Sequence, residues 1–292
     1  MPGFLYGYQQ FRKQIESPIV REQDKDALKK LQTMIRPFVL RRLKKDVLKD
    51  LPDKIEKNMF AELEGEQSEL YRARAQRLAM QLARQTEDEF RDSVCRYCRR
   101  STRLRQLCCD PGLLYEGYHS PAAKVELCME LLKNALEGGH RVLVFSLVTS
   151  MLEILVQRMQ QENISCCVLT GSTSKEDRAK LVERFQKEEV PVFCISLKAG
   201  GTGLNLTAAD MVIHFDPWWN AAVENQATDR AHRIGQKQVV TVYRLIAKNT
   251  IEEKILKLQE AKKELAQQVL SGDELKSASF TREELLGLLE YV

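Results

Sequence analysis

The chain has 292 residues, of which 43% are hydrophobic and 29% charged, and its formal net charge at pH 7 is +4. A chain of this length and composition can bury a full core, as one large domain or two small ones. It contains no run of about 18 apolar residues, and Met1 is not followed by a charged segment and an apolar core, so the sequence predicts neither a membrane span nor a signal peptide. We therefore expect an intracellular protein.

The charge is unevenly distributed along the chain. Residues 1–120 carry 24 Lys and Arg against 18 Asp and Glu, whereas the remainder carries 21 against 23. A basic surplus of this size is compatible with a polyanionic partner, but many globular proteins have one.

The eight cysteines are too few for a disulfide scaffold, and most lie in apolar runs, where a thiol behaves as a small hydrophobe. The exception is Cys95-x-x-Cys98 followed by Cys108 and Cys109, a set that could in principle bind zinc. Because Cys108 and Cys109 are adjacent and the intervening RRSTRLRQL is typical of a helix, we expect no metal site here, and the sequence does not decide whether Cys95 and Cys98 bind metal.

The first part of the chain has helical patterns. Residues 1–115 contain long charged stretches such as SELYRARAQRLAMQLARQTEDEFRD, with few Gly or Pro. They predict a helical region that is interrupted at Pro37 and Pro52. The turn-rich stretch DPGLLYEGYHSPAAK, at 110–124, is typical of a junction into another domain.

From residue 121 onward, short apolar runs alternate with amphipathic helical patterns. Apolar strands separated by helices imply a parallel sheet covered on both faces, which is a three-layer α/β fold. A further helix is expected after residue 250. The expected strands are at 142–146, 166–171, 190–196, 211–215 and 241–246, and the expected helices near 150–162, 174–187 and 219–233.

Polar residues and glycines follow four of the expected strands. Carboxyl ends of parallel strands meet at one edge of the sheet, where ligands bind in open α/β folds. Any one of these loops is explained equally well by capping of strands and helices, but four at one edge favour a binding site. They begin at Ser146, at Thr170-Gly171-Ser172, at Ser196-Leu-Lys-Ala-Gly-Gly and at Asp216-Pro-Trp-Trp.

The glycines at 200, 201 and 203 would let a backbone approach an anion, but they complete no known phosphate loop. The dinucleotide-binding pattern G-x-G-x-x-G is incomplete here, because its third glycine is missing. The chain also contains no Gly-Lys dipeptide, so there is no Walker A loop. We therefore expect neither an NAD site nor a triphosphate site formed by this chain alone.

The segment QATDRAHRIGQ places Gln226, Arg230 and Arg233 four and three residues apart. On a helix these side chains would share one face and could reach one ligand together. Two arginines on a helix are often merely solvated. Here they follow the expected binding edge, which suits two guanidinium groups reaching a phosphoryl group held elsewhere.

LKAGGTGLNLTAADMVIHFDPWWN followed by QATDRAHRIGQ resembles motifs V and VI of the SNF2 (Rad54-like) branch of superfamily 2 helicases, which are ATP-driven translocases on double-stranded DNA. RPFVLRRLKKDVLKDLP, RLRQLCCDP, RVLVFSLVTSMLEIL and LTGSTSKEDRAKLVERF extend the resemblance along nearly the whole chain. It implies a RecA-like parallel sheet, the second ATPase lobe, at 116–250, after a helical linker and protrusion region at 1–115. C-terminal helices, including a brace helix, would occupy 251–292. WWNAAVEN departs from the family's frequent WNP and resembles bacterial and archaeal members more than chromatin remodellers, which disfavours nucleosomes as the substrate.

The resemblance also implies a function. The chain would be half of an ATPase that moves along double-stranded DNA and remodels or displaces DNA-bound proteins. ATP and Mg²⁺ would be held mainly by a first lobe of the same polypeptide, and the chain alone would be inactive. The protein would lie in the cytoplasm with the nucleoid if bacterial or archaeal, and in the nucleus if eukaryotic.

Family roles carry over to matching positions of this sequence. The catalytic set comprises Arg230 and Arg233 as arginine fingers and Gln226, which orients the site. The nucleotide-binding set is Gly201, Gly203 and Asp229. The DNA-binding set is Ser146, Gly171, Ser172, Arg178, Lys198, Gly200 and Trp219.

Three other functions compete with this one. A helicase acting on RNA is the nearest rival. A degenerate lobe that binds without catalysis is disfavoured because Arg230 and Arg233 are both present. A nicotinamide oxidoreductase is disfavoured by the broken glycine pattern.

Overall fold

The computed structural model describes residues 7–22, 24–35, 51–83, 101–199, 203–218, 220–257 and 259–260. The chain forms two compact units, one of residues 1–49 with 256–285 and the other of residues 50–255 with 286–292. Within the described ranges, no helix combines the length and the apolar content that crossing a bilayer requires.

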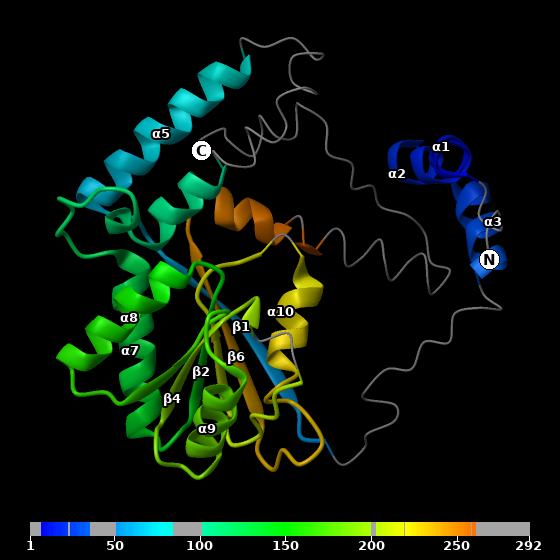
Figure 1. Cartoon of the computed structure of the whole chain (residues 1–292). Coiled ribbons are helices and arrows are strands. Elements are labelled where there is room, and N and C mark those ends of the chain that lie inside the picture. Colours follow the sequence, from blue (N-terminus) through cyan, green and yellow to red (C-terminus); the bar gives the residue numbers. More distant parts are fainter. Residues whose placement is uncertain are drawn as a thin grey trace. The chain divides into compact units, whose positions relative to one another are not determined.

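The larger unit is built on a six-stranded sheet in the order β1-β6-β5-β2-β4-β3, in which every neighbouring pair of strands is parallel (Figure 1). The predicted parallel sheet is therefore confirmed. Its strands are β1 (Lys54–Ala61), β2 (Val142–Ser146), β3 (Cys166–Leu169), β4 (Val192–Ser196), β5 (Met211–His214) and β6 (Val240–Ala247).

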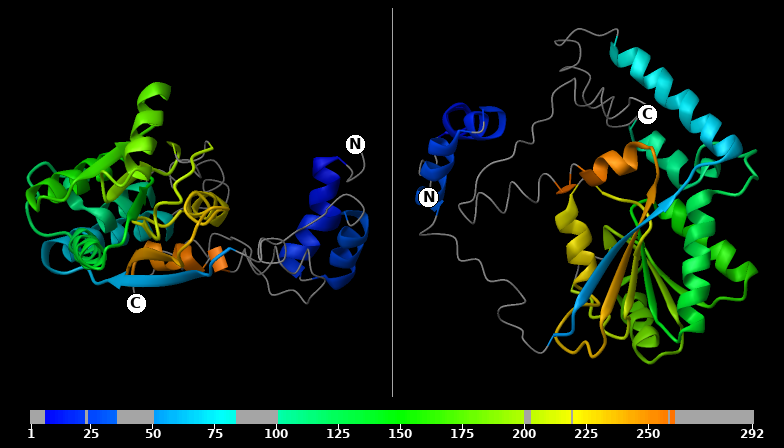
Figure 2. Two further views of the ribbon diagram at one scale, coloured as in Figure 1. Left: turned by 90° about the horizontal axis from the view of Figure 1, so that it is seen from below. Right: turned by 180° about the vertical axis from the view of Figure 1, so that it is seen from behind.

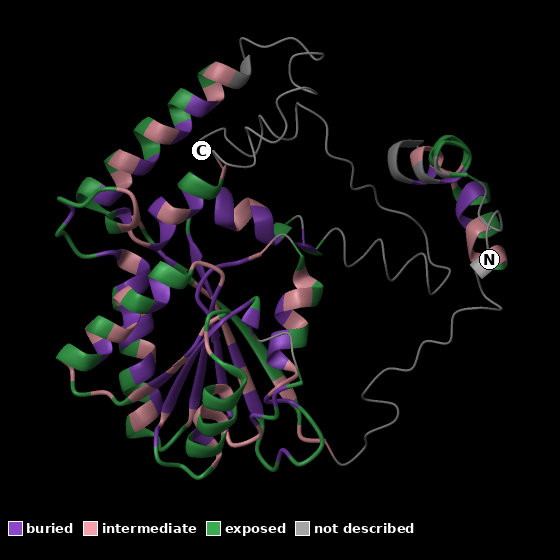
Figure 3. Cartoon of the chain, in the orientation of Figure 1, coloured by how far each residue is buried: buried purple, intermediate pink, exposed green. Residues whose placement is uncertain are grey.

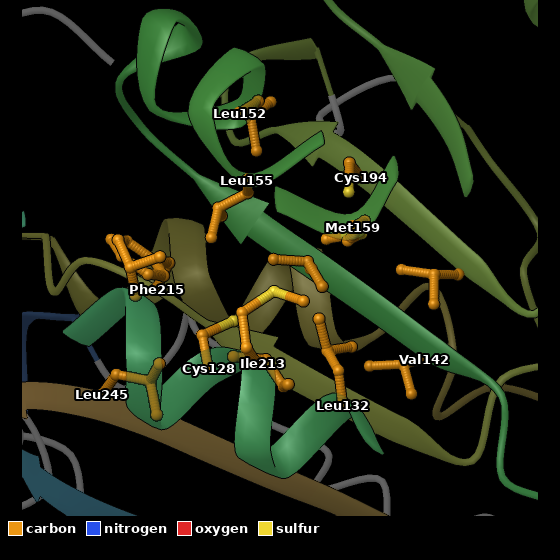
Figure 4. Packing of buried hydrophobic residues seen from close by; sticks show 14 of the residues in the cluster. Cys128, Leu132, Val142, Leu152, Leu155, Met159, Cys194, Ile213, Phe215 and Leu245 are labelled. Carbon is orange, nitrogen blue, oxygen red and sulfur yellow. The ribbon is translucent and has the colours of Figure 1, made fainter. Parts of the chain in front are cut away.

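Helices cover both faces of the sheet, which gives the three predicted layers. On one face, α7 (Ala123–Glu137) and α8 (Thr149–Gln161) bury their apolar sides, and Figure 4 shows Cys128, Leu132 and Leu155 of these helices packed against strand residues. On the other face lie α9 (Lys175–Gln186) and α10 (Ala221–Thr228), which contribute Phe185 and Ala227 to a second core. Alternate residues of each strand pack into the two cores, because successive side chains of a strand point to opposite faces of the sheet.

Strand β1 corrects the prediction that residues 1–115 are helical. Its eight residues pair with β6 from Lys54 opposite Val240 to Ala61 opposite Ala247, and Figure 2 shows it beside β6 at one edge of the sheet. An edge strand needs no continuous apolar run. Ile55 and Phe60 remain 44% and 50% exposed, so the mixed sequence KIEKNMFA lacked the signal that identified the inner strands.

Three helical segments pack together beyond the carboxyl end of β6. The long helix α5 (Gly65–Ala83) buries one stripe that includes Tyr71 and Leu78, against Leu104 of the helical residues 101–109 and Ile251 of the helix that follows β6. The remaining sides of α5 are largely exposed (Figure 3). A short 3₁₀ helix, η2 (Pro111–Leu113), leads from residues 101–109 toward α7.

The smaller unit contains α1 (Tyr8–Phe11), the π-helical η1 (Arg12–Glu16), α2 (Ser17–Glu22) and α3 (Lys25–Ile35). These elements bury a compact apolar cluster. Asp24 caps α3 by accepting a hydrogen bond from the Asp26 N–H at 2.8 Å. The buried members of the cluster are Ile15, Ile19, Ala27 and Leu28.

A buried ion pair joins the start of α7 to the helix that follows β6. Lys124 Nζ lies 2.8 and 2.9 Å from the two carboxylate oxygens of Glu252, and both side chains are 0% exposed. Glu252 also accepts a hydrogen bond from the Ala247 N–H at 2.9 Å. Burial opposes the charged form, yet neighbouring groups that include Glu252 and Asp216 raise the pKa of Lys124 above its ordinary value, so the side chain stays protonated.

We predict that Lys124→Met lowers the free energy of unfolding by about 3–5 kcal/mol, because it leaves the Glu252 carboxylate buried without a counter-charge. Lys124→Met/Glu252→Gln should recover most of the loss, since no uncompensated charge then remains. Urea denaturation monitored by circular dichroism measures both.

Lys133→Met is the matched control on the same helix. The Lys133 side chain is 53% exposed in its pair with Glu162, so its loss should change the free energy of unfolding by no more than about 0.5 kcal/mol. Equal effects of the Lys124 and Lys133 substitutions would contradict a structural role for the buried pair.

Candidate functional site

The carboxyl edge of the sheet is fastened by Asp216, which follows β5. Its carboxylate accepts hydrogen bonds from the Ser146 hydroxyl at 3.0 Å and from the Leu147 N–H at 2.9 Å, so it ties the end of β5 to the end of β2. Ser146 is only 1% exposed. Its hydroxyl therefore cannot meet a phosphate in this conformation, and we correct its expected role from DNA contact to support of the Asp216 loop.

Exposed polar groups follow β3 and β4, which are neighbours in the sheet. Ser172 and Gly171 are exposed in the turn after β3, where the hydroxyls of Thr170 and Ser172 lie 2.8 Å apart. Lys198 is exposed just after β4. These predicted DNA-contact residues therefore share one edge.

Of the other predicted DNA-contact and nucleotide-contact residues, Arg178 is half-buried in the first part of α9. Gly200, Gly201 and Trp219 lie outside the described residues.

The loop after Asp216 is held from two sides. Arg105, 4% exposed, donates from Nη2 to the Pro217 carbonyl at 2.6 Å, and its guanidinium carbon lies 5.2 Å from the centre of the Trp218 ring. On the other side, the backbone N–H of Trp218 donates to the Glu224 carboxylate of α10 at 2.6 Å. A cation over an indole face adds to the hydrogen bond, so Arg105 fixes both the backbone and the ring of this loop.

Charges continue from Glu224 across β6 to β1. Arg244 Nε lies 3.5 Å from the Glu224 carboxylate, and Arg244 Nη2 lies 2.8 Å from that of Glu56. Although burial favours its neutral form, the hydrogen bond from Lys54 and the charge of Arg244 lower the pKa of Glu56 to about 2. Burial, with the positive charge of Arg244 added, lowers the pKa of His214 to about 3. His214 is thus neutral at pH 7 and shares a 2.8 Å hydrogen bond with Thr228.

The predicted helix over 219–233 is shorter than expected. Helix α10 ends at Thr228, with Asp229 as its C-cap, so Gln226 lies on the helix whereas Arg230 and Arg233 lie on the turns after it. The expectation that the three side chains share one helical face is therefore corrected. After the helix ends, the Arg230 N–H bonds the Ala227 carbonyl three residues back at 3.1 Å, and the Arg230 carbonyl accepts a long-range hydrogen bond from the Leu206 N–H at 3.0 Å.

Gln236 holds these turns in place. Its amide nitrogen donates to the carbonyls of Ala209 at 2.7 Å and Ala231 at 3.2 Å, and its amide oxygen accepts from the N–H groups of Lys237 and Gln238. A single buried side chain thus satisfies backbone groups of three loop segments.

The turns lie at the amino edge of the sheet, opposite the Asp216 loop. Ala209 lies two residues before the start of β5, and His232 bonds the Pro52 carbonyl, two residues before β1, at 2.7 Å. In Figure 1, α10 accordingly runs from the carboxyl edge at the top to the amino edge at the bottom. The arginines and the DNA-contact candidates are therefore at opposite edges of the sheet, although in the sequence the arginines come soon after the expected binding edge.

The turn residues differ in their access to a ligand. Arg233 and Gln226 are exposed, whereas Asp229 and Arg230 are half-buried. Over the described ranges, no ion pair involves Arg233. Gly203 is exposed with φ +53°, a left-handed conformation that favours glycine. An accessible guanidinium on a rigid turn suits recognition of a phosphoryl group.

Sequence reasoning did not assign Arg105, Glu224 or Gln236. Arg105 lies in the block RLRQLCCDP, which contributes to the family resemblance but to which no function was assigned. The contacts of Glu224 and Gln236 are with residues that only the folded chain brings close. The cysteines of that block, Cys108 and Cys109, are buried, and burial raises the pKa of both thiols. Cys95 and Cys98 lie outside the described residues.

Comparison with known families identifies two matches in chain order. The SNF2-related domain matches residues 1–113, and the helicase conserved C-terminal domain matches residues 123–235. An uncharacterised ATP-dependent helicase of Mycoplasma pneumoniae is 38% identical over 99% of this chain and 27% of its own length. The putative ATP-dependent helicase/translocase YwqA of Bacillus subtilis is 39% identical over 93% of this chain and 30% of its own length. The chain thus spans less than a third of these relatives.

Solved structures give the same result. The SWI2/SNF2 ATPase core of Sulfolobus solfataricus in complex with dsDNA is 32% identical, with a TM-score of 0.67, over 100% of this chain and 62% of that one. The C-terminal domain of the S. solfataricus SWI2/SNF2 ATPase is 31% identical, with a TM-score of 0.65, over 82% of this chain and 100% of that one. The chain therefore belongs to the SNF2 family of superfamily 2 helicases.

Proposed function

We propose that this chain is the second ATPase lobe of an SNF2-type translocase on double-stranded DNA, which remodels or displaces DNA-bound proteins. The observation that carries the proposal is the turn after α10, where Gln236 rigidly holds a segment that exposes the Arg233 guanidinium. The choice of double-stranded DNA is supported by a solved relative, the SWI2/SNF2 ATPase core of S. solfataricus, whose structure is a complex with dsDNA.

In this proposal, Arg230 and Arg233 act on a nucleotide held mainly by a first lobe of the same polypeptide. When bound, ATP would supply the phosphoryl group that is transferred to water, and Mg²⁺ would neutralise part of its charge. The chain's own residues fit this role because Arg233 is exposed and unpaired within the described ranges, so no carboxylate there must be displaced. Gln226 and Asp229, at the end of α10, flank the arginines, and Gly203 lies on the preceding loop.

Duplex DNA would lie at the opposite, carboxyl edge. The proposed contacts are the exposed residues of the β3 and β4 ends, Gly171, Ser172 and Lys198, with Arg178 beside them. Such groups bind phosphates, which position a protein on DNA without reading its sequence. Gly200 and Trp219 remain proposed contacts from the family resemblance.

We predict that Arg230→Lys and Arg233→Lys each reduce DNA-stimulated ATP turnover by about 10³- to 10⁵-fold in the polypeptide that carries both lobes, because lysine cannot reproduce the planar fork of an arginine finger. ATP affinity should fall much less. Turnover, ATP affinity and melting temperature are measured on the same preparations.

Arg184→Lys on α9 is the matched control, since Arg184 is an exposed arginine paired with Glu189. It should leave turnover unchanged. Near wild-type hydrolysis by either finger variant would refute the finger role. A lower melting temperature together with lower activity would instead indicate that the arginines stabilise the fold.

We also predict that the 292-residue chain alone hydrolyses ATP at background rate, with or without duplex DNA. It supplies arginines, but it contains no Gly-Lys dipeptide and hence no Walker A loop to hold the triphosphate. Phosphate release is measured with and without a separately supplied first lobe. Robust DNA-stimulated turnover by the chain alone would refute its assignment as a single lobe.

For DNA, we predict that Lys198→Gln makes the slope of log affinity against log salt shallower by about 0.9, the value for one lost phosphate contact on duplex DNA. Affinity should fall equally for unrelated sequences. Fluorescence anisotropy with labelled duplexes measures both. The control is Lys187→Gln, which removes an exposed lysine at the C-terminal end of α9, away from the proposed contacts. An unchanged slope for Lys198→Gln would exclude this contact.

A further inference from the structure

Three arginines converge on one cleft outside the RecA-like core. The cleft has a volume of about 230 Å³ and lies between α5 and the helical residues 101–109. Its lining consists of Arg74, Arg77, Leu78, Gln81 and Arg103.

The arrangement of the cleft follows from the two helices. Arg74 and Arg77 are three residues apart on α5 and so share a face. Leu78, buried in the helical cluster, anchors that face against the neighbouring helix, which contributes Arg103. The structure therefore brings together three positive charges that the sequence separates.

The described residues that line the cleft carry no charge that balances the three arginines, since none of them is acidic. Within the described ranges, no ion pair involves Arg74, Arg77 or Arg103, and the last two are exposed. Like charges held close together repel, so an anion in the cleft is stabilised by all three.

The cleft belongs to the carboxyl side of the unit. Arg103 and Arg105 are two residues apart, about 200° around a helix, so they face in opposite directions. Arg105 points inward and bonds Pro217 of the Asp216 loop, while Arg103 is exposed at the cleft. Helix α5 rises from the same edge, beginning four residues after β1 ends (Figure 1). One helix thus connects the cleft to the edge proposed to bind DNA.

We propose that this cleft, lined by Arg74, Arg77 and Arg103, binds a phosphate of the duplex backbone at a second position, beyond the contacts at the β3 and β4 ends. The inference rests on the proposed function. Arginine favours such a ligand because its planar guanidinium donates to phosphate oxygens in pairs. A duplex phosphate is favoured over an acidic protein segment because one of the two helices that form the cleft also contacts, through Arg105, a loop at the carboxyl edge proposed to hold DNA.

The experiment measures duplex binding by the 292-residue chain with fluorescence anisotropy over a range of salt concentrations. Arg77→Gln/Arg103→Gln should weaken binding to all sequences equally and make the salt slope shallower by about 0.9, for the one lost phosphate contact. Arg77→Lys/Arg103→Lys should retain most of the slope, since it keeps the charges.

Arg72→Gln/Lys133→Gln is the charge-matched control, with one substitution on α5 and one on α7, both outside the cleft. If it changes the slope as much as the cleft variant does, overall charge accounts for the effect and the proposal fails. The proposal also fails if the cleft variant binds DNA like the wild type, which would leave an acidic protein segment as the ligand of the arginines. It fails as well if the variant melts at a lower temperature without weaker binding, which would indicate that the arginines stabilise the fold.

Lys198→Gln separates the two proposals. If Lys198→Gln weakens binding and the cleft variant does not, the cleft proposal falls and the proposed function stands. If the wild-type chain does not bind duplex DNA, both fall.

Discussion

The single direction of all six strands is the constraint on which the rest of this structure depends. A parallel strand cannot return by a hairpin, so the connections between inner strands must cross the sheet, and the helices that do so cover both of its faces. The same constraint gives the sheet two chemically different edges. At the carboxyl edge, the loops after β2 and β5 are joined through Ser146 and Asp216. At the amino edge, the loops entering β5 and β6 are joined through Gln236.

Buried charges hold the carboxyl edge together. Lys124 and Glu252 join α7 to the helix after β6, and Arg105 holds the loop after Asp216. Each is costly to bury unless its partners are in place, so each position depends on the completed fold around it. Most of these partners are distant in sequence, 128 residues apart for Lys124 and Glu252 and 112 for Arg105 and Pro217. They fix the relation between the helical segments and the sheet, which apolar packing alone specifies less strictly.

The inner strands were predictable from the sequence because both of their faces are buried, which demands continuous apolar runs such as VLVFS. Strand β1 was not, because an exposed edge tolerates the charges of KIEKNMFA. The residues of the arginine turn were identified from the sequence, but the predicted helical conformation was wrong. The spacing of Gln226, Arg230 and Arg233 fits a helix, whereas in the structure Arg230 lies in a turn and its carbonyl accepts a hydrogen bond from the distant Leu206 N–H. Ser146 shows the same limit, since spacing placed it at the correct edge but could not reveal its burial.

Helix α10 spans the distance between the two edges. Its eight residues extend about 12 Å at 1.5 Å per residue. Near its start, Glu224 accepts the hydrogen bond from Trp218 in the loop held by Arg105, and at its end Thr228 bonds His214, which is uncharged at pH 7. Under the proposed function, one short rigid element therefore joins the loop at the DNA edge to the turn that carries Arg230 and Arg233. A shift of the Trp218 loop must either break the bond to Glu224 or move α10, and movement of α10 displaces the arginines. Both outcomes cost free energy: the first leaves the buried Glu224 carboxylate with one partner fewer, and the second strains the hydrogen bonds by which Gln236 and Leu206 hold the turn that follows α10.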